Sequence, residues 1–193
     1  QYVYAISNRN LYTASSKTNQ AYLKKLWLHS LASAYTAQTT TAHLKINPKI
    51  DPFTFGLLHD IGKLILLEII GELAAGNEAF KNIQPHALDA LLLQLHCKFG
   101  AILLKRWKFP QRIVDIALYH ENISKAPAIT KELTIANFSS TLANSIGYAM
   151  SKRDQEASME TSETVAMLKL SPDDIEQIST SVKEQVNTFN TMI

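Results

Sequence analysis

A histidine and an aspartate stand next to each other within an apolar stretch of the sequence. His59 and Asp60 follow Leu57 and Leu58 and precede Ile61, so burial of these neighbours carries the pair inward. A carboxylate in apolar surroundings is costly unless something pairs with it. A metal ion, a hydrogen-bonded partner or a second histidine could each be that partner, and the stretch alone leaves the three alternatives open.

Candidate partners occur on other segments of the chain. His29, His96 and His120 lie in or beside apolar stretches, and Asn137 adds a polar side chain to a later one. Ligands on separate helices can converge on one metal in the core of a helical bundle. Imidazoles suit transition metals, whereas carboxylates suit harder ions and can bridge two of them. Two such ions could activate a water molecule against a phosphoester.

Spacing alone is weak support for a metal site, because any helical protein with six histidines offers such sets. Taken singly, a core histidine is more often hydrogen-bonded than metal-bound, and His43 and His86 are interpreted as surface or capping residues. Cys97, the single cysteine, is interpreted as a small buried hydrophobic residue in an apolar helix. One cysteine excludes an intrachain disulfide, in agreement with a reducing cytoplasm.

The composition is that of an ordinary globular protein. The 193 residues, 46% hydrophobic and 19% charged, suffice for one substantial core. The formal net charge of +2 is too small to favour nucleic acid or an anionic membrane as a partner. Residues 105–112 hold a cluster of cations of the kind that a helix C-terminus attracts. No uninterrupted apolar run approaches about 20 residues and no signal-peptide pattern is present, so we expect no membrane segment and a cytoplasmic location.

The spacing of apolar residues predicts an all-α protein. Apolar positions recur at threes and fours, and only six glycines and six prolines interrupt the chain. Asp51 before Pro52 predicts a capped helix start. Residues 1–18 are expected to be irregular and 151–162 to form a mobile loop. Helices are expected over residues 19–43, 52–75, 85–107, 110–121, 130–150, 164–170 and 171–193.

The last of these helices has a narrow apolar stripe. Ser171, Pro172 and the acids after them form a strong helix start, and Ile178, Val182 and Val186 continue the stripe. An amphipathic helix over 171–193 is therefore expected. It suits packing on the body of the domain, which we favour, or against a second subunit in a homodimer.

Two motifs resemble the HD superfamily of metal-dependent phosphohydrolases. They are the run LWLHSLA over 26–32 and the run GLLHDIGK over 56–63. More narrowly, HCKFGAILL over 96–104, followed by WKFP over 107–110, resembles the HDOD family, the HD-related output domains of bacterial signalling proteins. The resemblance covers about residues 20–150 and implies a single helical domain over 1–193, folded as a multi-helix HD-type bundle.

The resemblance also implies a set of site residues. Asp60 and Lys63 are candidate catalytic residues, with Lys63 near a substrate phosphate. Asn137 stands at the position where catalytic relatives supply a second aspartate. If the site is functional, a divalent transition metal (Fe or Mn) or Mg is expected, and otherwise no cofactor. The implied metal ligands are His29, His59, Asp60, His96 and His120.

The sequence departs from the motifs of catalytic relatives at several positions, and these departures determine which function we expect. A neutral amide at Asn137 is a poorer ligand for a hard cation than a carboxylate. Glu121 stands where cyclic-dinucleotide phosphodiesterases of the HD-GYP type have a second histidine, and residues 124–127 replace their Gly-Tyr-Pro loop. Only 28 residues precede His29, so part of the N-terminal segment of the family is expected to be missing.

We therefore expect a non-catalytic signal-transduction module with an incomplete metal site. Its partners would be proteins of a signalling pathway, among them domains of the same longer chain. Two alternatives remain open. The first is a metal-dependent phosphohydrolase acting on a nucleotide or cyclic dinucleotide, and the second is a metal or nucleotide sensor without turnover.

Overall fold

The computed structural model describes residues 17–81, 83–155 and 163–192, and the regular elements within these ranges are all helices. The all-α prediction is confirmed. The expected irregular N-terminal segment, up to residue 16, and most of the expected loop, residues 156–162, lie outside the described residues. The described part of that loop contains a short helix, α9, where the sequence predicted no regular structure.

Ten α-helices and two short turns follow one another in the described chain. The helices are α2 (Lys17–His43), α3 (Pro52–Leu58), α4 (Ile61–Gly76), α5 (Glu78–Lys81), α6 (Pro85–Arg106), α7 (Gln111–Tyr119), α8 (Lys131–Ala143), α9 (Lys152–Gln155), α10 (Glu163–Leu168) and α11 (Pro172–Met192). A 3₁₀ turn, η2 (Ile123–Lys125), follows α7, and a π turn, η3 (Asn144–Tyr148), follows α8.

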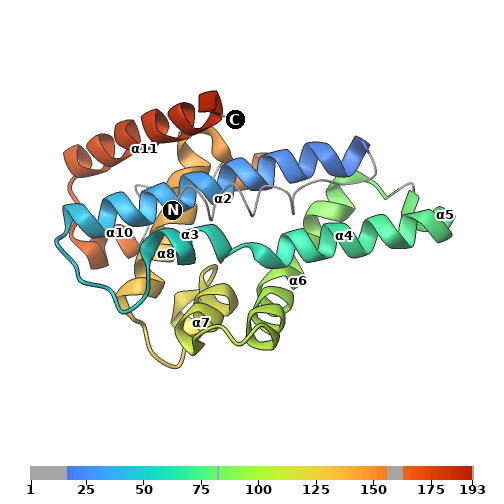
Figure 1. Cartoon of the computed structure of the whole chain (residues 1–193), viewed down its shortest axis with the longest axis horizontal. Helices are drawn as coiled ribbons and strands as arrows, with labels where there is room; N and C mark the ends of the chain where they lie inside the picture. The colour runs from blue at the N-terminus through green and yellow to red at the C-terminus, as the bar shows by residue number, and fades with distance from the viewer. Residues whose placement is uncertain (1–16, 82, 156–162, 193) are drawn as a thin grey trace.

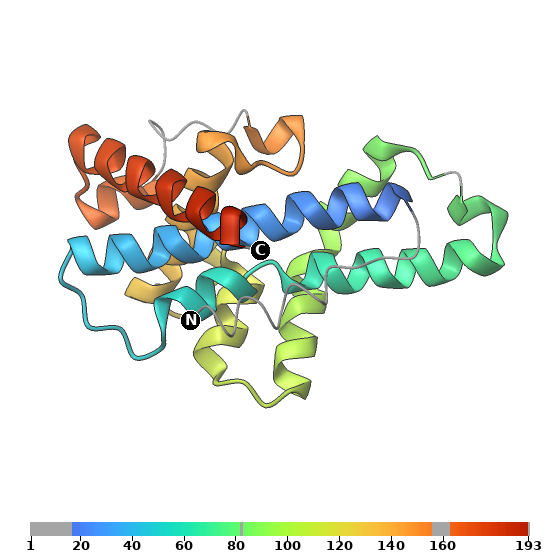
Figure 2. The ribbon, with the colours of Figure 1, turned by 45° about the horizontal axis from the view of Figure 1, so that its top comes forward.

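Helix α2 runs through the middle of the fold, and α3, α8 and α11 pack around it (Figure 1). Figure 2 shows α11 lying along α2 from a second direction. The amphipathic stripe of α11 buries Val182, Val186 and Phe189, and the ring of Phe189 lies 6.0 Å from that of Trp27 on α2. The C-terminal helix therefore packs on the body of this chain.

The prediction of one helix over 52–75 is wrong in one respect. The helix is broken at His59 and Asp60. It starts as predicted, with the Asp51 carboxylate accepting from Thr54 N at 2.8 Å and Pro52 in the first turn. It ends at Leu58, and α4 begins at Ile61. Between them Asp60 has φ −100° and ψ 13°, outside the helical range, and its side chain makes no capping bond to α4. The break turns the Asp60 carboxylate inward instead.

Two glycines bring α4 and α6 into close contact. A Cβ at Gly62 would collide with the backbone of His96 and Gly100, and Gly100 lies against the backbone of Gly62. Gly62 and Gly100 are thus counterparts, one on each helix of the crossing. This crossing sets α6 against the residue pair that opens α4, so Asp60 and His96 become neighbours.

Helix α8 ends earlier than the predicted residue 150. It stops at Ala143, and the π turn that follows contains Gly147 with φ 105°, a conformation that glycine adopts readily. The turn brings the carbonyl of Tyr148 to His29 Nδ1 at 3.1 Å. The early end of α8 thereby supplies a backbone partner to a candidate site residue.

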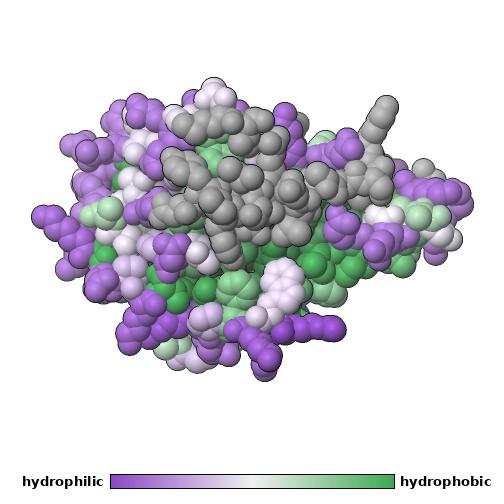
Figure 3. Space-filling model, viewed as in Figure 1, coloured by the Kyte–Doolittle hydropathy of each residue, from purple (hydrophilic) through white to green (hydrophobic). Residues whose placement is uncertain are grey.

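Among the described helices, α6 is long and apolar enough to cross a membrane, judged by length and composition alone. A third of its most apolar stretch is buried, and α6 packs against α4 and α7. Some large apolar side chains of α6 and of its neighbour α4 are exposed to solvent. Ile102 of α6 is 66% exposed, and Ile69 of α4 is 37% exposed. Figure 3 shows hydrophobic side chains gathered over α4 and α6 on this face.

Candidate metal centre

The structure brings five of the sequence candidates together around one carboxylate. His29 comes from α2, His59 and Asp60 from the break before α4, His96 from α6, and His120 from the residue after α7. Each side chain is at most 2% exposed. Five polar groups from four parts of the chain are thus withdrawn from water together, which requires that they satisfy one another or share a ligand.

The orientation of each imidazole follows from a backbone carbonyl that faces its Nδ1 atom. The pairs are His29 with Tyr148 at 3.1 Å, His59 with Gly56 at 2.7 Å, His96 with Leu92 at 2.8 Å, and His120 with Ile116 and Ala117 at 3.2 Å each. A carbonyl only accepts, so Nδ1 carries the hydrogen and a neutral ring keeps its lone pair on Nε2. The Nε2 atoms of all four rings face the Asp60 carboxylate.

The four Nε2 atoms form two triangles, one with each oxygen of Asp60. With Oδ2, His29 and His59 give edges of 3.3, 3.4 and 3.5 Å. With Oδ1, His96 and His120 give edges of 3.4, 3.4 and 3.3 Å. Asp60 is therefore the shared corner of two donor sets.

These donor sets fit divalent cations. Tetrahedral bonds of about 2.0–2.1 Å to nitrogen and oxygen place neighbouring donors about 3.3–3.5 Å apart, which is the range of all six edges. Among the described residues Oδ1 of Asp60 has no hydrogen-bond partner, although it is buried. An orphaned carboxylate oxygen facing imidazole lone pairs is what a cation would satisfy, and the group could hold a metal ion.

Lys63 is the cation that the chain itself supplies. Its Nζ lies 2.7 Å from Asp60 Oδ2, and the residue is 9% exposed. Burial alone would raise the pKa of Asp60, but Lys63 and the surrounding imidazoles hold it well below its ordinary value. Burial likewise opposes the charged ammonium, yet the attraction of Asp60 raises the pKa of Lys63. Both groups are charged at neutral pH.

Three of the imidazoles are held neutral. Burial lowers the pKa of His29 and of His59, and it lowers that of His96 to about 4. Burial acts on His120 in the same direction, but the Asp60 carboxylate outweighs it and raises the pKa. Neutral imidazoles with outward lone pairs are in the form that binds metal.

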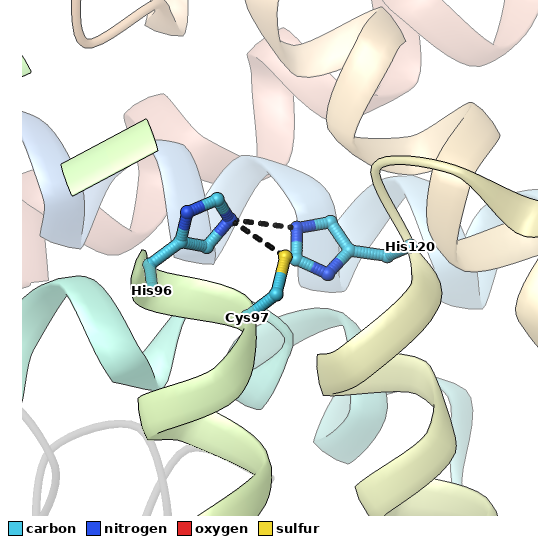
Figure 4. A group of neighbouring side chains, drawn as sticks. All are labelled: His96, Cys97 and His120. Carbon is cyan, nitrogen blue, oxygen red and sulfur yellow. Dashed lines mark hydrogen bonds between the residues drawn. The ribbon is translucent and has the colours of Figure 1, made fainter. Parts of the chain in front are cut away.

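Two residues outside the expected ligand set lie at the edge of the Oδ1 triangle. One is Glu121, which the resemblance places at a histidine position, and the other is Cys97. Glu121 Oε1 is 3.6 Å from His96 Nε2 and 3.7 Å from His120 Nε2, and its side chain is 44% exposed. The Cys97 thiol donates to His96 Nε2 at 3.2 Å (Figure 4). The interpretation of Cys97 as a small buried hydrophobic residue is corrected, since the side chain is partly buried and its thiol contacts an imidazole. The adjacency of His96 and Cys97 was the available sequence signal.

Asn137 has partners other than the histidine cluster. Its Nδ2 donates to the His120 carbonyl at 2.7 Å, and its Oδ1 accepts from Thr164 at 3.0 Å. Ser140, one turn later on α8, is the side chain that reaches the cluster, with Oγ 3.4 Å from His29 Nε2. The amide of Asn137 thus holds the end of α7, and its correspondence to an aspartate of catalytic relatives stays a prediction.

The remaining histidines lie elsewhere. His43 pairs with Asp174 at the start of α11 at 2.8 Å, and His86 is exposed at the start of α6. His86, Asp89 and Asp154 help to line a pocket of about 340 Å³, which Lys63 also lines. Lys63 thus joins the buried centre to a space that a small molecule could enter.

Comparisons with known proteins place the chain in a family context. The family model described as HDOD domain matches residues 1–123. An uncharacterized protein of Treponema pallidum is 30% identical over 119 residues, which are 60% of this chain and 22% of the relative. The chain therefore spans about a fifth of the curated relative it matches.

Two solved structures resemble this chain, and the first of them shares its fold. One is an HDOD domain protein with unknown function from Geobacter sulfurreducens, with a TM-score of 0.56 and 21% identity, covering 94% of this chain and 68% of that one. The other is the HD domain of the L. monocytogenes phosphodiesterase PgpH in complex with cyclic-di-AMP, with a TM-score of 0.48 and 18% identity, covering 88% and 93%.

Proposed function

Because the chain belongs to the HDOD family, we propose that it is a non-catalytic regulatory module of a bacterial cytoplasmic signalling chain. In this role the helical body carries the state of neighbouring domains or protein partners, and the histidine centre stabilises its core. One fold can serve both catalytic and non-catalytic functions, so the choice between them depends on the residues of the site.

The observation that carries the proposal is the type of side chain that α8 places next to the histidine centre. Ser140 brings a hydroxyl to His29, while Asn137, where resemblance to catalytic relatives implies an aspartate, holds the His120 carbonyl with a neutral amide. Asp60 is then the fully buried carboxylate of the centre, and Lys63 already neutralises it. A centre with so little negative charge holds a hard cation weakly, and its ion pair remains satisfied without one.

A metal, where bound, would meet ligands that are already oriented. His29 and His59 would hold it beside Asp60 Oδ2, and His96 and His120 beside Oδ1, and it would supply Lewis acidity and positive charge there. The chain itself fixes the tautomers through backbone carbonyls, excludes water and holds the carboxylate. These features also support a purely structural centre, in which α2, α4, α6 and α7 meet.

The length of the Treponema pallidum protein suggests which partners such a module has. The Treponema pallidum protein is much longer than the region it shares with this chain. That difference supports a module that works beside other domains. A domain or ligand can switch it only by binding one conformation better than another, and a centre shared by several helices offers two-state coupling between them.

The proposal is tested by incubating the purified chain with phosphodiester and cyclic-dinucleotide substrates and Mn²⁺, Fe²⁺ or Mg²⁺. We expect wild type and Asp60→Ala to show the same residual rate. Circular dichroism checks that both remain helical. A wild-type rate that disappears in folded Asp60→Ala would show that the domain is an enzyme.

One observation favours a metal-dependent phosphohydrolase as the second candidate. Lys63 lines the 340 Å³ pocket and also touches Asp60, so a phosphate in the pocket could reach both the ammonium and the centre. If this function is correct, Lys63→Met lowers turnover while the metal content of the purified protein is kept. Equal turnover in Lys63→Met and wild type would exclude this role of the lysine.

A further inference from the structure

Most of the large hydrophobic side chains that stay exposed lie on α4 and at the end of α6. Ile69 and Leu73 are exposed on α4, and Ile102 and Trp107 are exposed at the end of α6. They are four of the six exposed large hydrophobic side chains in the part of the chain that the structure describes. Isolated exposed hydrophobic residues need no explanation, but groups of them rimmed by polar residues mark interaction surfaces.

The exposed hydrophobic side chains of α4 lie between carboxylates. Glu68 precedes Ile69 and Glu72 precedes Leu73, and residues four positions apart in a helix share a face. Glu72 is exposed and Glu68 is partly exposed, and neither forms an ion pair within the described residues. The acidic surface, which consists of these four residues, therefore combines apolar area with unpaired negative charge.

The exposed hydrophobic side chains at the end of α6 lie among cations instead. Lys98, Ile102 and Arg106 recur every four residues, so they form one line along the exposed side of the helix. The basic surface is defined by six exposed residues, which are Lys98, Ile102, Lys105, Arg106, Trp107 and Lys108. Its four cations form no ion pair with any residue that the structure describes, and residues 90–114 contain no aspartate or glutamate.

The distribution of charge sets the basic surface apart from the rest of the chain. Residues 90–114 carry five lysines and arginines and no acid, so the formal net charge of +2 for the whole chain leaves −3 for the remainder. A helix dipole attracts cations only at its last turn, and Lys98 lies about two turns before the end of α6. The dipole therefore does not account for the whole of this surface.

Both surfaces lie on parts of the molecule that another molecule can reach. The C-terminal half of α4 extends away from the body of the fold toward α5, and the end of α6 lies at the tip of the lobe that it forms with α7 (Figures 1 and 2). Gly62 and Gly100 fix the crossing of α4 and α6, and no ion pair joins the two surfaces within the described chain. Only a second molecule can therefore bring these opposite charges together.

We propose that this chain self-associates, with the acidic surface of one copy bound to the basic surface of another. The two surfaces are opposite in charge, and each contributes exposed apolar side chains that the contact would bury. The apolar stripe of α11, which the sequence offered as another dimer surface, is buried within the copy. The inference goes beyond the regulatory proposal and depends neither on metal binding nor on hydrolysis.

The contact should be weak, because each surface is small. Four and six residues are fewer than the about 20–30 per partner of a stable interface, so association should rise with protein concentration. Because the two surfaces differ, the contact is heterologous, and it closes into a dimer only if each copy turns both surfaces to the same partner.

Charge reversal tests the pairing by sedimentation velocity on the full chain. One variant carries Lys105→Glu and Arg106→Glu, a second carries Glu68→Lys and Glu72→Lys, and the control carries Lys183→Glu and Glu184→Lys at exposed positions of α11. With rising concentration, the mean mass of wild type and control should exceed the 21.6 kDa of one copy. Each surface variant alone should stay monomeric. Their equimolar mixture should associate, because it contains one native surface of each kind.

A neutral substitution tests the apolar part of the contact. Ile102→Ala keeps every charge and changes a side chain that is 66% exposed, so the fold should be unaffected. It should weaken association at least about tenfold, since each buried methylene group changes an affinity about fourfold. Circular dichroism checks that all variants remain helical.

Four outcomes overturn the proposal. They are a wild type that stays monomeric at every concentration, folded surface variants that associate as wild type does, a mixture of the two that stays monomeric, and equal association of Ile102→Ala and wild type. A monomeric wild type that binds phosphatidylglycerol vesicles, and loses this binding with Lys105→Glu and Arg106→Glu, would assign the basic surface to a membrane instead. These outcomes leave the regulatory proposal intact, because that proposal is read from hydrolysis assays.

Discussion

The carboxylate of Asp60 and the ammonium of Lys63 form a 2.7 Å ion pair inside the helical body. Asp60 is 0% exposed and Lys63 is 9% exposed, so each group depends on the other for its charge. Breaking a buried pair by removing one partner costs far more than the pair itself contributes. The lysine therefore occupies, in charge and position, part of the role that a metal would have.

Replacement of Lys63 separates its contribution to folding stability from its effect on cation binding. Lys63→Met leaves Asp60 unpaired, and we expect the metal-free protein to lose about 3–5 kcal/mol in urea unfolding. Divalent cations should bind more tightly to the variant, because the repelling ammonium is gone. Exposed Lys105→Met is the matched control and should change neither quantity. Unchanged stability and Mn²⁺ affinity in Lys63→Met would mean that the pair has little energetic weight.

Gly62→Ala tests the crossing of α4 and α6. The added methyl group would meet the backbone of His96, which cannot rotate away, so we expect a loss of at least about 1–3 kcal/mol. Gly76→Ala is the control, since a Cβ there meets nothing within 4 Å. Alanine in place of this helical glycine should add about 0.4–1 kcal/mol. Equal thermal unfolding of the two variants would refute the packing argument.

Asn137→Ala distinguishes a structural amide from a metal ligand. The variant removes the bond to the His120 carbonyl and the bond from Thr164, and we expect it to lose about 1–3 kcal/mol. Metal content per chain should stay at the wild-type value, whereas His59→Ala should lower it. Atomic emission on the two purified variants makes the comparison. Metal loss in Asn137→Ala equal to that in His59→Ala would restore the amide as a ligand.

Glu132 gives the fold a pH dependence. Its carboxylate accepts from Lys49 N at 3.0 Å and pairs with Arg112 at 3.5 Å, tying the α2–α3 connector to α7 and α8. Burial would raise the pKa of Glu132, but these partners hold it below 4.5. A carboxyl with a depressed pKa stabilises the fold above pH 4.5, and the stabilisation disappears as the pH falls through the lower folded value.

Glu132→Gln should therefore be less stable than wild type at pH 7, by about 1 kcal/mol, the difference between a charged and a neutral acceptor. The gap should close as the pH falls from 4.5 through the lower pKa of the folded protein, where the wild-type carboxyl takes up its proton. Urea unfolding at a series of pH values measures it. A gap that stays constant down to pH 3 would contradict the assignment.

Local patterns in the sequence determined the helices of this protein. Apolar spacing found nearly every long helix, and Asp51 with Pro52 fixed the start of α3, because capping and side-chain burial depend on residues a few positions apart. The same spacing missed the break at Asp60. Periodicity continues through that break, and only the inward turn of the carboxylate, set by distant imidazoles, ends the helix there.

The candidate site could likewise be predicted only in part from the sequence. The sequence supplied the imidazoles and the carboxylate, since residue types next to apolar stretches suffice to nominate them. Only the tertiary structure decided that the two oxygens of Asp60 face different histidine pairs, that Ser140 and not Asn137 reaches the cluster, and that Cys97 lies beside it. These relationships depend on how α4, α6 and α8 cross, and crossing geometry is set by packing between residues far apart in the chain.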